Sequence, residues 1–175
     1  MRLSTQIPFF GLLPLLAAAP VPAQSPVTAV PVTWVIADSA ARTVNLALEV
    51  TAPAGSPSAL LNGYREGDVQ IVVPLRWTVV WDWRSADSAG RHSLVLMAER
   101  EKLPTEGGRP AFTNAMSRSV TAGVAAGQSD RTTFEAEEAG WYWLLCGVPG
   151  HAIAGEWIEL RVDPEATTAG VKRKA

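Results

Sequence analysis

Cysteine and histidine are both scarce in this chain of 175 residues, which contains one cysteine and two histidines. A single cysteine cannot form a disulfide within the chain, so a small fold held together by several disulfides is excluded. The thiol that remains needs another explanation: a bond between chains, burial in the core, a role as nucleophile, or metal ligation.

Charge and helical periodicity are also weak, and each absence removes a class of protein. The formal net charge is only −2, so we expect no nucleic-acid partner. No window of a dozen residues combines a helical period of apolar residues with capping residues, which argues against a helical bundle.

The N-terminal segment, residues 1–23, is expected to be a secretion signal. Arg2 supplies a positive charge, residues 9–19 are mostly apolar, and Ala23 is a small residue suited to cleavage before Gln24. The apolar run is too short to span a bilayer, so we expect no stable membrane insertion after cleavage. The mature protein is therefore expected to be periplasmic or secreted.

The rest of the chain alternates short apolar runs with turn residues. In the segments 44–50, 69–73 and 77–83, β-branched, aromatic or other apolar residues occupy every second position, which is the period of a half-buried strand. This pattern predicts an all-β fold, a Greek-key β-sandwich of about seven to eight strands. We place the folded domain at residues 24–163 and a flexible tail at residues 164–175.

The cysteine and one histidine lie close together near the C-terminus. Cys146 follows a strand-like run, and His151 comes five residues later, beyond the turn Gly147-Val-Pro-Gly150. The turn reverses the chain, so the thiolate and the imidazole can face one point. His92 begins an apolar run much earlier and has to reach the same point from another strand. A thiolate and two imidazoles form the trigonal ligand set of a blue-copper site.

The motif Cys146-Gly-Val-Pro-Gly-His151-Ala-x-x-Gly155-x-Trp157 resembles the copper loop of the sulfocyanin-type cupredoxins. Three upstream segments occur in the order in which that family has similar ones: Leu61-Asn-Gly-Tyr64, Val72-Val-Pro74 and His92-Ser-Leu-Val95. The resemblance covers roughly residues 60–162. It implies a cupredoxin-like fold and one copper ion that alternates between Cu(I) and Cu(II), with His92, Cys146 and His151 as equatorial ligands.

Glu156 departs from the family pattern, which has an axial methionine at this position, five residues after the second histidine ligand. A carboxylate is a harder ligand than a thioether and favours Cu(II), so a coordinating Glu156 would lower the reduction potential. The alternative is that Glu156 turns outward to solvent, because an unpaired carboxylate is costly to bury. We include Glu156 with His92, Cys146 and His151 in the predicted metal site.

The resemblance implies an exported electron carrier and not an enzyme. Such a carrier exchanges single electrons with protein partners through a small, transient interface, which we expect near His151. The main alternative is a copper enzyme or sensor that acts on a small molecule such as nitric oxide through a red-copper-like Cys/His/His/Glu site.

Three further classes of site compete with this interpretation. A hydrolytic Cys–His pair lacks a visible oxyanion-stabilising device. Three methionines are too few for the Met-rich surface of an exported copper-delivery protein. Zinc remains open as the metal, because the same four side chains suit a tetrahedral zinc site.

Overall fold

The computed structural model describes residues 28–174, and every structural statement below concerns this part of the chain. The secretion signal expected at residues 1–23 lies outside the described residues. The described part contains eleven strands and no helix, and hence no helix long and apolar enough to cross a membrane.

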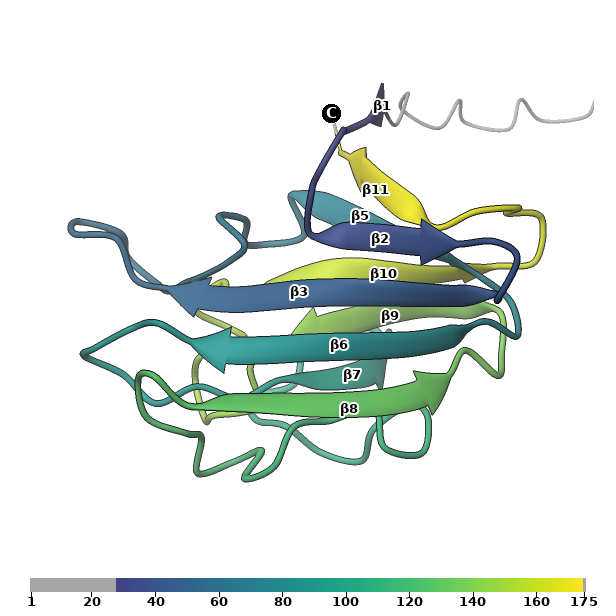
Figure 1. Cartoon of the computed structure of the whole chain (residues 1–175). Coiled ribbons are helices and arrows are strands. Elements are labelled where there is room, and N and C mark those ends of the chain that lie inside the picture. Colours follow the sequence, from purple (N-terminus) through teal and green to yellow (C-terminus); the bar gives the residue numbers. More distant parts are fainter. Residues whose placement is uncertain (1–27, 175) are drawn as a thin grey trace, which may run out of the picture.

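The strands form two sheets that pack face to face (Figure 1). One sheet has the order β2 (Val35–Asp38), β3 (Thr43–Thr51), β6 (Thr78–Ser85), β8 (Ser129–Glu135), and β4 (Leu60–Leu61) pairs with β3. The other has the order β1 (Thr28–Ala29), β11 (Gly170–Arg173), β5 (Val69–Pro74), β10 (Trp157–Asp163), β9 (Gly140–Leu145), β7 (Val95–Ala98). Strand β3 runs parallel to β6 and β10 parallel to β5, whereas the other strand pairs are antiparallel.

The predicted all-β sandwich is confirmed, although it has more strands than the seven to eight expected. The additional strands include β1 and β4, which have two residues each. A two-residue strand has no recognisable period of its own, and only pairing with a neighbouring strand defines it.

The core lies between the two sheets and follows the alternation of the sequence. On β6, Trp81 and Trp83 are buried, whereas Asp82 between them is exposed. Trp81 packs edge-on against Phe134 of β8, with ring centroids 5.3 Å apart. An aromatic side chain buries about 150–250 Å², so these rings in the core hold β6 in place in its sheet.

The C-terminal segment corrects a prediction. Residues 164–175 are expected to be a flexible tail, yet Gly170–Arg173 form β11, which pairs antiparallel with β5, and Val171 is buried. Lys174 forms an ion pair with the buried Glu159 of β10. The prediction is therefore wrong for residues 170–173, and the folded domain extends beyond its predicted end at residue 163. This strand is too short for its period to be recognised, and β5 and β1 supply its hydrogen bonds.

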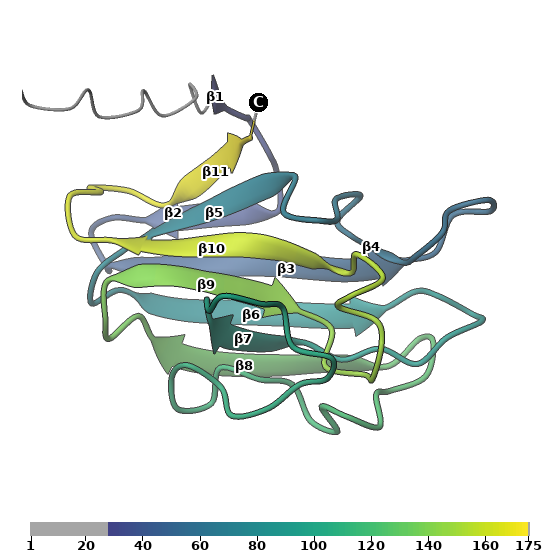
Figure 2. The ribbon, with the colours of Figure 1, turned by 180° about the vertical axis from the view of Figure 1, so that it is seen from behind.

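The segments that carry the predicted ligands lie at one end of the sandwich. Leu145 at the end of β9 pairs with Trp157 at the start of β10, so the connection 146–156 closes over the edge of the sheet. This end is on the left in Figure 1 and on the right in Figure 2. Strand β6 ends at the same side, and the loop that follows it leads to His92.

Candidate metal centre

Cys146 and Glu156 face each other where the connection between β9 and β10 begins and ends. The amide of Cys146 donates a hydrogen bond to the carbonyl of Glu156 at 3.0 Å, which continues the pairing of Leu145 with Trp157 by one position. Residues directly opposite each other in an antiparallel pair project to the same side of the sheet. Both side chains are buried. Strand pairing therefore holds the thiol and the carboxyl group side by side.

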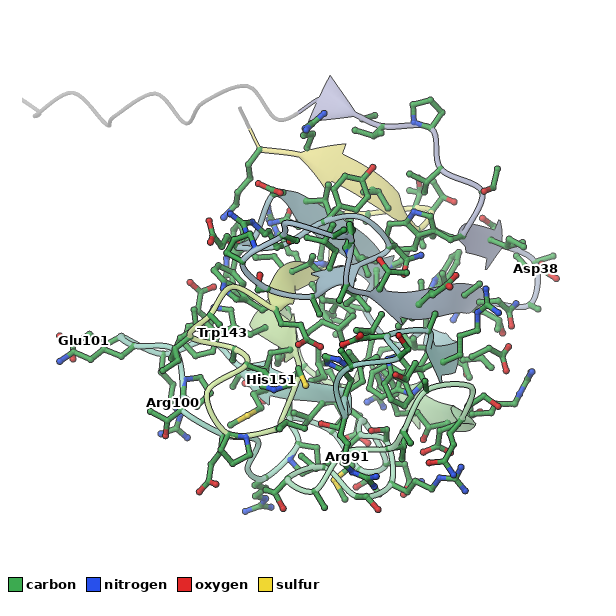
Figure 3. The ribbon with its side chains drawn as sticks, turned by 90° about the vertical axis from the view of Figure 1, so that its left-hand side faces the viewer. Asp38, Arg91, Arg100, Glu101, Trp143 and His151 are labelled. Atoms are coloured by element: carbon green, nitrogen blue, oxygen red, sulfur yellow. The ribbon has the colours of Figure 1, made fainter. Side chains whose placement is uncertain are left out.

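Tight turns in residues 147–155 bring His151 back to the same point. The amide of His151 donates to the carbonyl of Val148 at 3.1 Å, and the preceding Gly150 has a φ of 85°, which glycine adopts without strain. Nδ1 of His151 lies 3.5 Å from Sγ of Cys146 and 3.0 Å from Oε2 of Glu156. Figure 3 shows His151 at this end of the molecule, between Trp143 and Arg91.

His92 reaches the site from the loop between β6 and β7. Its amide donates to the carbonyl of Val124 at 3.1 Å, and the amide of Val124 donates back at 2.7 Å. Nδ1 of His92 lies 2.8 and 3.0 Å from the two carboxylate oxygens of Glu156. One ligand atom from each of His92, Cys146, His151 and Glu156 lies within 4.8 Å of all the others. The structure thus brings all four predicted residues together.

Glu156 points into this cluster and not outward to solvent. Only 3% of its surface is exposed, and both imidazoles place Nδ1 within hydrogen-bond distance of its oxygens. Burial acts to raise the pKa of Glu156, but the hydrogen bonds and charges of His151 and His92 outweigh burial and lower it. The cost of burying this carboxylate is thus offset by two partners, which is why the outward alternative does not occur.

The same contacts change the pKa values of the other three groups. Burial acts to lower the pKa of His92, but Cys146 and Glu156 outweigh it and raise this pKa to about 10. Hydrogen bonds to Cys146 and Glu156 raise the pKa of His151 to about 9. Burial opposes ionisation of Cys146, yet the two histidines lower the pKa of its thiol. Hydrogen bonds link these groups, and a bound metal cation would take the place of the protons in them.

We expect copper binding to release protons. Both imidazoles are protonated on both ring nitrogens and positively charged at pH 7, because their pKa values are about 10 and about 9, whereas an imidazole must lose one of these protons to bind a metal. Each ion should displace about two protons at pH 7, and the apparent affinity should weaken as the pH falls. Calorimetric titration in buffers of different ionisation enthalpy counts the protons. Binding without proton release would show that the ion does not use these histidines.

Ser93 is a contact of the site that the sequence pattern did not reveal. Its amide lies 3.4 Å from Sγ of Cys146, a residue 53 positions away. Its buried hydroxyl accepts a hydrogen bond from the amide of Gly147 at 2.9 Å and donates to the carbonyl of Val120. Ser93 therefore joins the cysteine loop to the His92 segment, and its amide favours the charged thiolate. In the sequence, only its position directly after His92 indicated that Ser93 could lie at the site.

The donor set fits copper. A thiolate and two imidazoles bind both Cu(I) and Cu(II), and a carboxylate adds a preference for Cu(II). Metal–ligand bonds of about 2.0–2.3 Å place two donors of one tetrahedral ion roughly 3.3–3.8 Å apart, and the 3.5 Å between Cys146 and His151 agrees with this. Glu156 lies closer to both imidazoles, 2.8 Å from Nδ1 of His92 and 3.0 Å from Nδ1 of His151, because it shares hydrogen bonds with them. These donors would need to separate by less than about 1 Å to act as ligands of one ion.

Comparison with known protein families identifies the chain. Residues 31–170 match the family described as the sulfocyanin (SoxE) domain. The chain belongs to this family. The match includes both segments that carry the predicted ligands, so the resemblance noted from the copper-loop motif is confirmed. No protein of curated function matches the chain significantly.

Several solved structures are similar to the chain at low sequence identity. Reduced rusticyanin is 17% identical with a TM-score of 0.48, over 70% of this chain and 85% of that chain. Auracyanin from Roseiflexus castenholzii is 20% identical with a TM-score of 0.46, over 67% and 97%. Auracyanin A from Chloroflexus aurantiacus, described as a blue copper protein, is 16% identical with a TM-score of 0.47, over 68% and 99%.

The sulfocyanin family is a family of cupredoxin-like blue-copper proteins. The prediction of one copper ion as cofactor is confirmed by this membership and by the His/Cys/His/Glu group, which could hold the ion. The copper in such a protein supplies a one-electron couple between Cu(II) and Cu(I).

Proposed function

We propose that this sulfocyanin-family protein transfers single electrons through one copper ion held by His92, Cys146, His151 and Glu156. The observation that carries the proposal is the convergence of these four side chains, from two separate parts of the chain, within 4.8 Å. Soft and hard donors in one cluster suit both oxidation states of copper.

The way the ligands are anchored supports electron transfer. Cys146 and Glu156 are joined by a backbone hydrogen bond of 3.0 Å that continues the pairing of β9 with β10, and two hydrogen bonds hold His92 to Val124. Because backbone pairing restrains these three ligands, they can keep their positions when the charge of the ion changes. A site that rearranges little lowers the barrier to each electron transfer.

His151 is the ligand through which we infer that electrons enter and leave. Its side chain is 31% exposed, whereas those of His92 and Glu156 are 3% exposed. Ile153, which is 60% exposed, and the exposed Ala154 follow it closely in the chain. A small apolar patch around an exposed ligand suits a transient interface with a protein redox partner.

We infer that this electron transfer takes place outside the cytoplasm, in the periplasm or in the secreted state. The support is the sequence pattern of residues 1–23, where a positive charge precedes an apolar run and a small residue suited to cleavage.

A cavity beside the cluster supports a second candidate function. It has a volume of about 290 Å³, and its lining includes His92, His151 and Glu156. This volume accommodates a molecule as small as nitric oxide, which could approach the copper from the side of Glu156. The observation favours a copper enzyme or sensor as the alternative to a carrier.

Spectroscopy of the copper-loaded protein separates the two functions. For a carrier, one equivalent of Cu(II) should produce a sulfur-to-copper absorption band and one EPR signal, and one electron per protein should remove both reversibly. Added azide should leave the absorption spectrum unchanged. A new charge-transfer band with azide would favour the enzyme or sensor, and a protein that stays colourless with stoichiometric Cu(II) would contradict both functions.

A further inference from the structure

Asp87 is a buried carboxylate that contacts His92 on the side of the ring away from the other ligands. Nε2 of His92 lies 2.8 Å from Oδ2 of Asp87, while Nδ1 of the same ring faces Glu156. When the imidazole is neutral, an Nε2–H bond donated to Asp87 leaves the lone pair of Nδ1 directed at the cluster. The side chain of Asp87 is only 8% exposed, so water competes little for this hydrogen bond.

The loop that leads to His92 is shaped around this contact. The second oxygen of Asp87, Oδ1, accepts a hydrogen bond from the amide of Ala89 at 2.8 Å, which holds the carboxylate in place. A Cβ atom at Gly90 would lie 2.6 Å from Oδ2 of Asp87 and 2.7 Å from Nε2 of His92. Real Cβ atoms do not approach other atoms this closely, so any other residue at position 90 would force Asp87, His92 or the loop itself to shift.

The segment after Gly90 is anchored as well. The guanidinium of Arg91 donates hydrogen bonds to the carbonyls of Ala122 and Gly123 at 3.0 and 2.8 Å. Together with the backbone hydrogen bonds between His92 and Val124, these contacts fix the position of the His92 backbone. Asp87 then determines how the ring is turned and which nitrogen carries the proton.

We propose that Asp87 is a positioning residue that orients His92 toward the copper and favours Cu(II) over Cu(I) through its negative charge. The proposal rests on the copper site proposed above. With one thiolate and one carboxylate ligand, Cu(II) forms a neutral centre, and adding one electron to give Cu(I) leaves it with one negative charge. A carboxylate on the far side of His92 opposes that added charge. Its hydrogen bond also makes the imidazole a stronger base and a stronger ligand for Cu(II).

Three variants of the full-length protein separate orientation from charge. D87N removes the charge and keeps one oxygen that can accept the hydrogen bond from Nε2–H, although its NH2 group cannot accept the bond that Ala89 donates to the second oxygen of Asp87. D87A removes the charge and both acceptor oxygens. The matched control is E101Q, which removes one exposed carboxylate that projects away from the rest of the molecule (Figure 3). The readout is the reduction potential, measured by optical titration of the copper-loaded proteins.

We expect D87N to lower the ratio of Cu(II) affinity to Cu(I) affinity about tenfold relative to E101Q, which corresponds to a potential about 59 mV higher. D87A should raise the potential too, and should weaken Cu(II) binding by about 10- to 100-fold, the usual loss when the hydrogen-bond partner of a ligating histidine is removed. Equal potentials in D87N and E101Q would overturn the proposed effect of charge.

NMR provides a second test, and its first part uses only the unaltered protein. In the diamagnetic Cu(I) protein, His92 should show an Nε2–H proton protected from exchange, and D87A should lose this protection while E101Q keeps it. An unprotected proton would overturn the positioning role, and a normal sulfur-to-copper band would still leave the proposed function standing. Failure of the unaltered protein to bind copper would overturn both proposals.

Discussion

Cys146→Ser should abolish the sulfur-to-copper absorption of the copper-loaded protein and weaken copper binding. Cys146 is the only cysteine in the chain, and its Sγ is the sulfur atom of the ligand cluster. A serine hydroxyl does not ionise at neutral pH and is a poor ligand for Cu(I). The change in shape is small, so the fold should persist. Absorption and EPR spectra after addition of one equivalent of Cu(II) measure the effect.

Met97→Leu is the matched control for this experiment. Met97 is half-buried and packs with Trp143 and Leu145 beside the site, so the variant removes a thioether sulfur from the same region at nearly constant volume. The control should retain the absorption band of the unaltered protein. If Cys146→Ser kept a band of similar intensity, the thiolate would not be a copper ligand, and the proposed site would have to be abandoned.

Glu156→Met should raise the reduction potential by about 100 mV, equivalent to about 2.3 kcal/mol for one electron. The substitution replaces a hard anionic ligand with a soft neutral one, which shifts the preference of the site from Cu(II) toward Cu(I). The structure supports a large effect, because Glu156 is 3% exposed and solvent therefore screens its charge poorly. Voltammetry of the copper-loaded protein measures the change.

Glu66→Gln tests whether loss of any nearby carboxylate has the same effect. The side chain of Glu66 is 56% exposed, and its carboxylate lies against Gly155, the residue next to Glu156. It therefore removes a negative charge close to the cluster without removing a ligand. We expect the potential of this variant to change far less. An unaltered potential in Glu156→Met would mean that the carboxylate does not touch copper.

The fold class could be predicted because its signal is local. Trp81 and Trp83 alternate with exposed residues along β6, and such a period of two requires only that one face of each strand be buried. The strand β11 could not be predicted in this way. Its four residues are too few to define a period, and its hydrogen bonds come from β5 and β1, about a hundred residues or more earlier in the chain.

The residues of the candidate metal site could be predicted from the sequence because so few residues compete for the role. With one cysteine and two histidines in the chain, Cys146, His151 and His92 were the only combination available for a Cys/His/His site. The spacing of Cys146 and His151 across a Pro-Gly turn is also a local property, since five residues in a tight turn bring both side chains to one point.

The sequence by itself thus determined the sandwich class and which side chains are available to bind a metal. Only the tertiary structure decided that Glu156 turns inward, that Asp87 holds the far side of His92, and that Ser93 contacts Cys146. The physical reason is that the direction of a buried polar side chain depends on its partners. For Glu156 one of these partners is His92, 64 residues away, and the pairing of strands sets that distance in space.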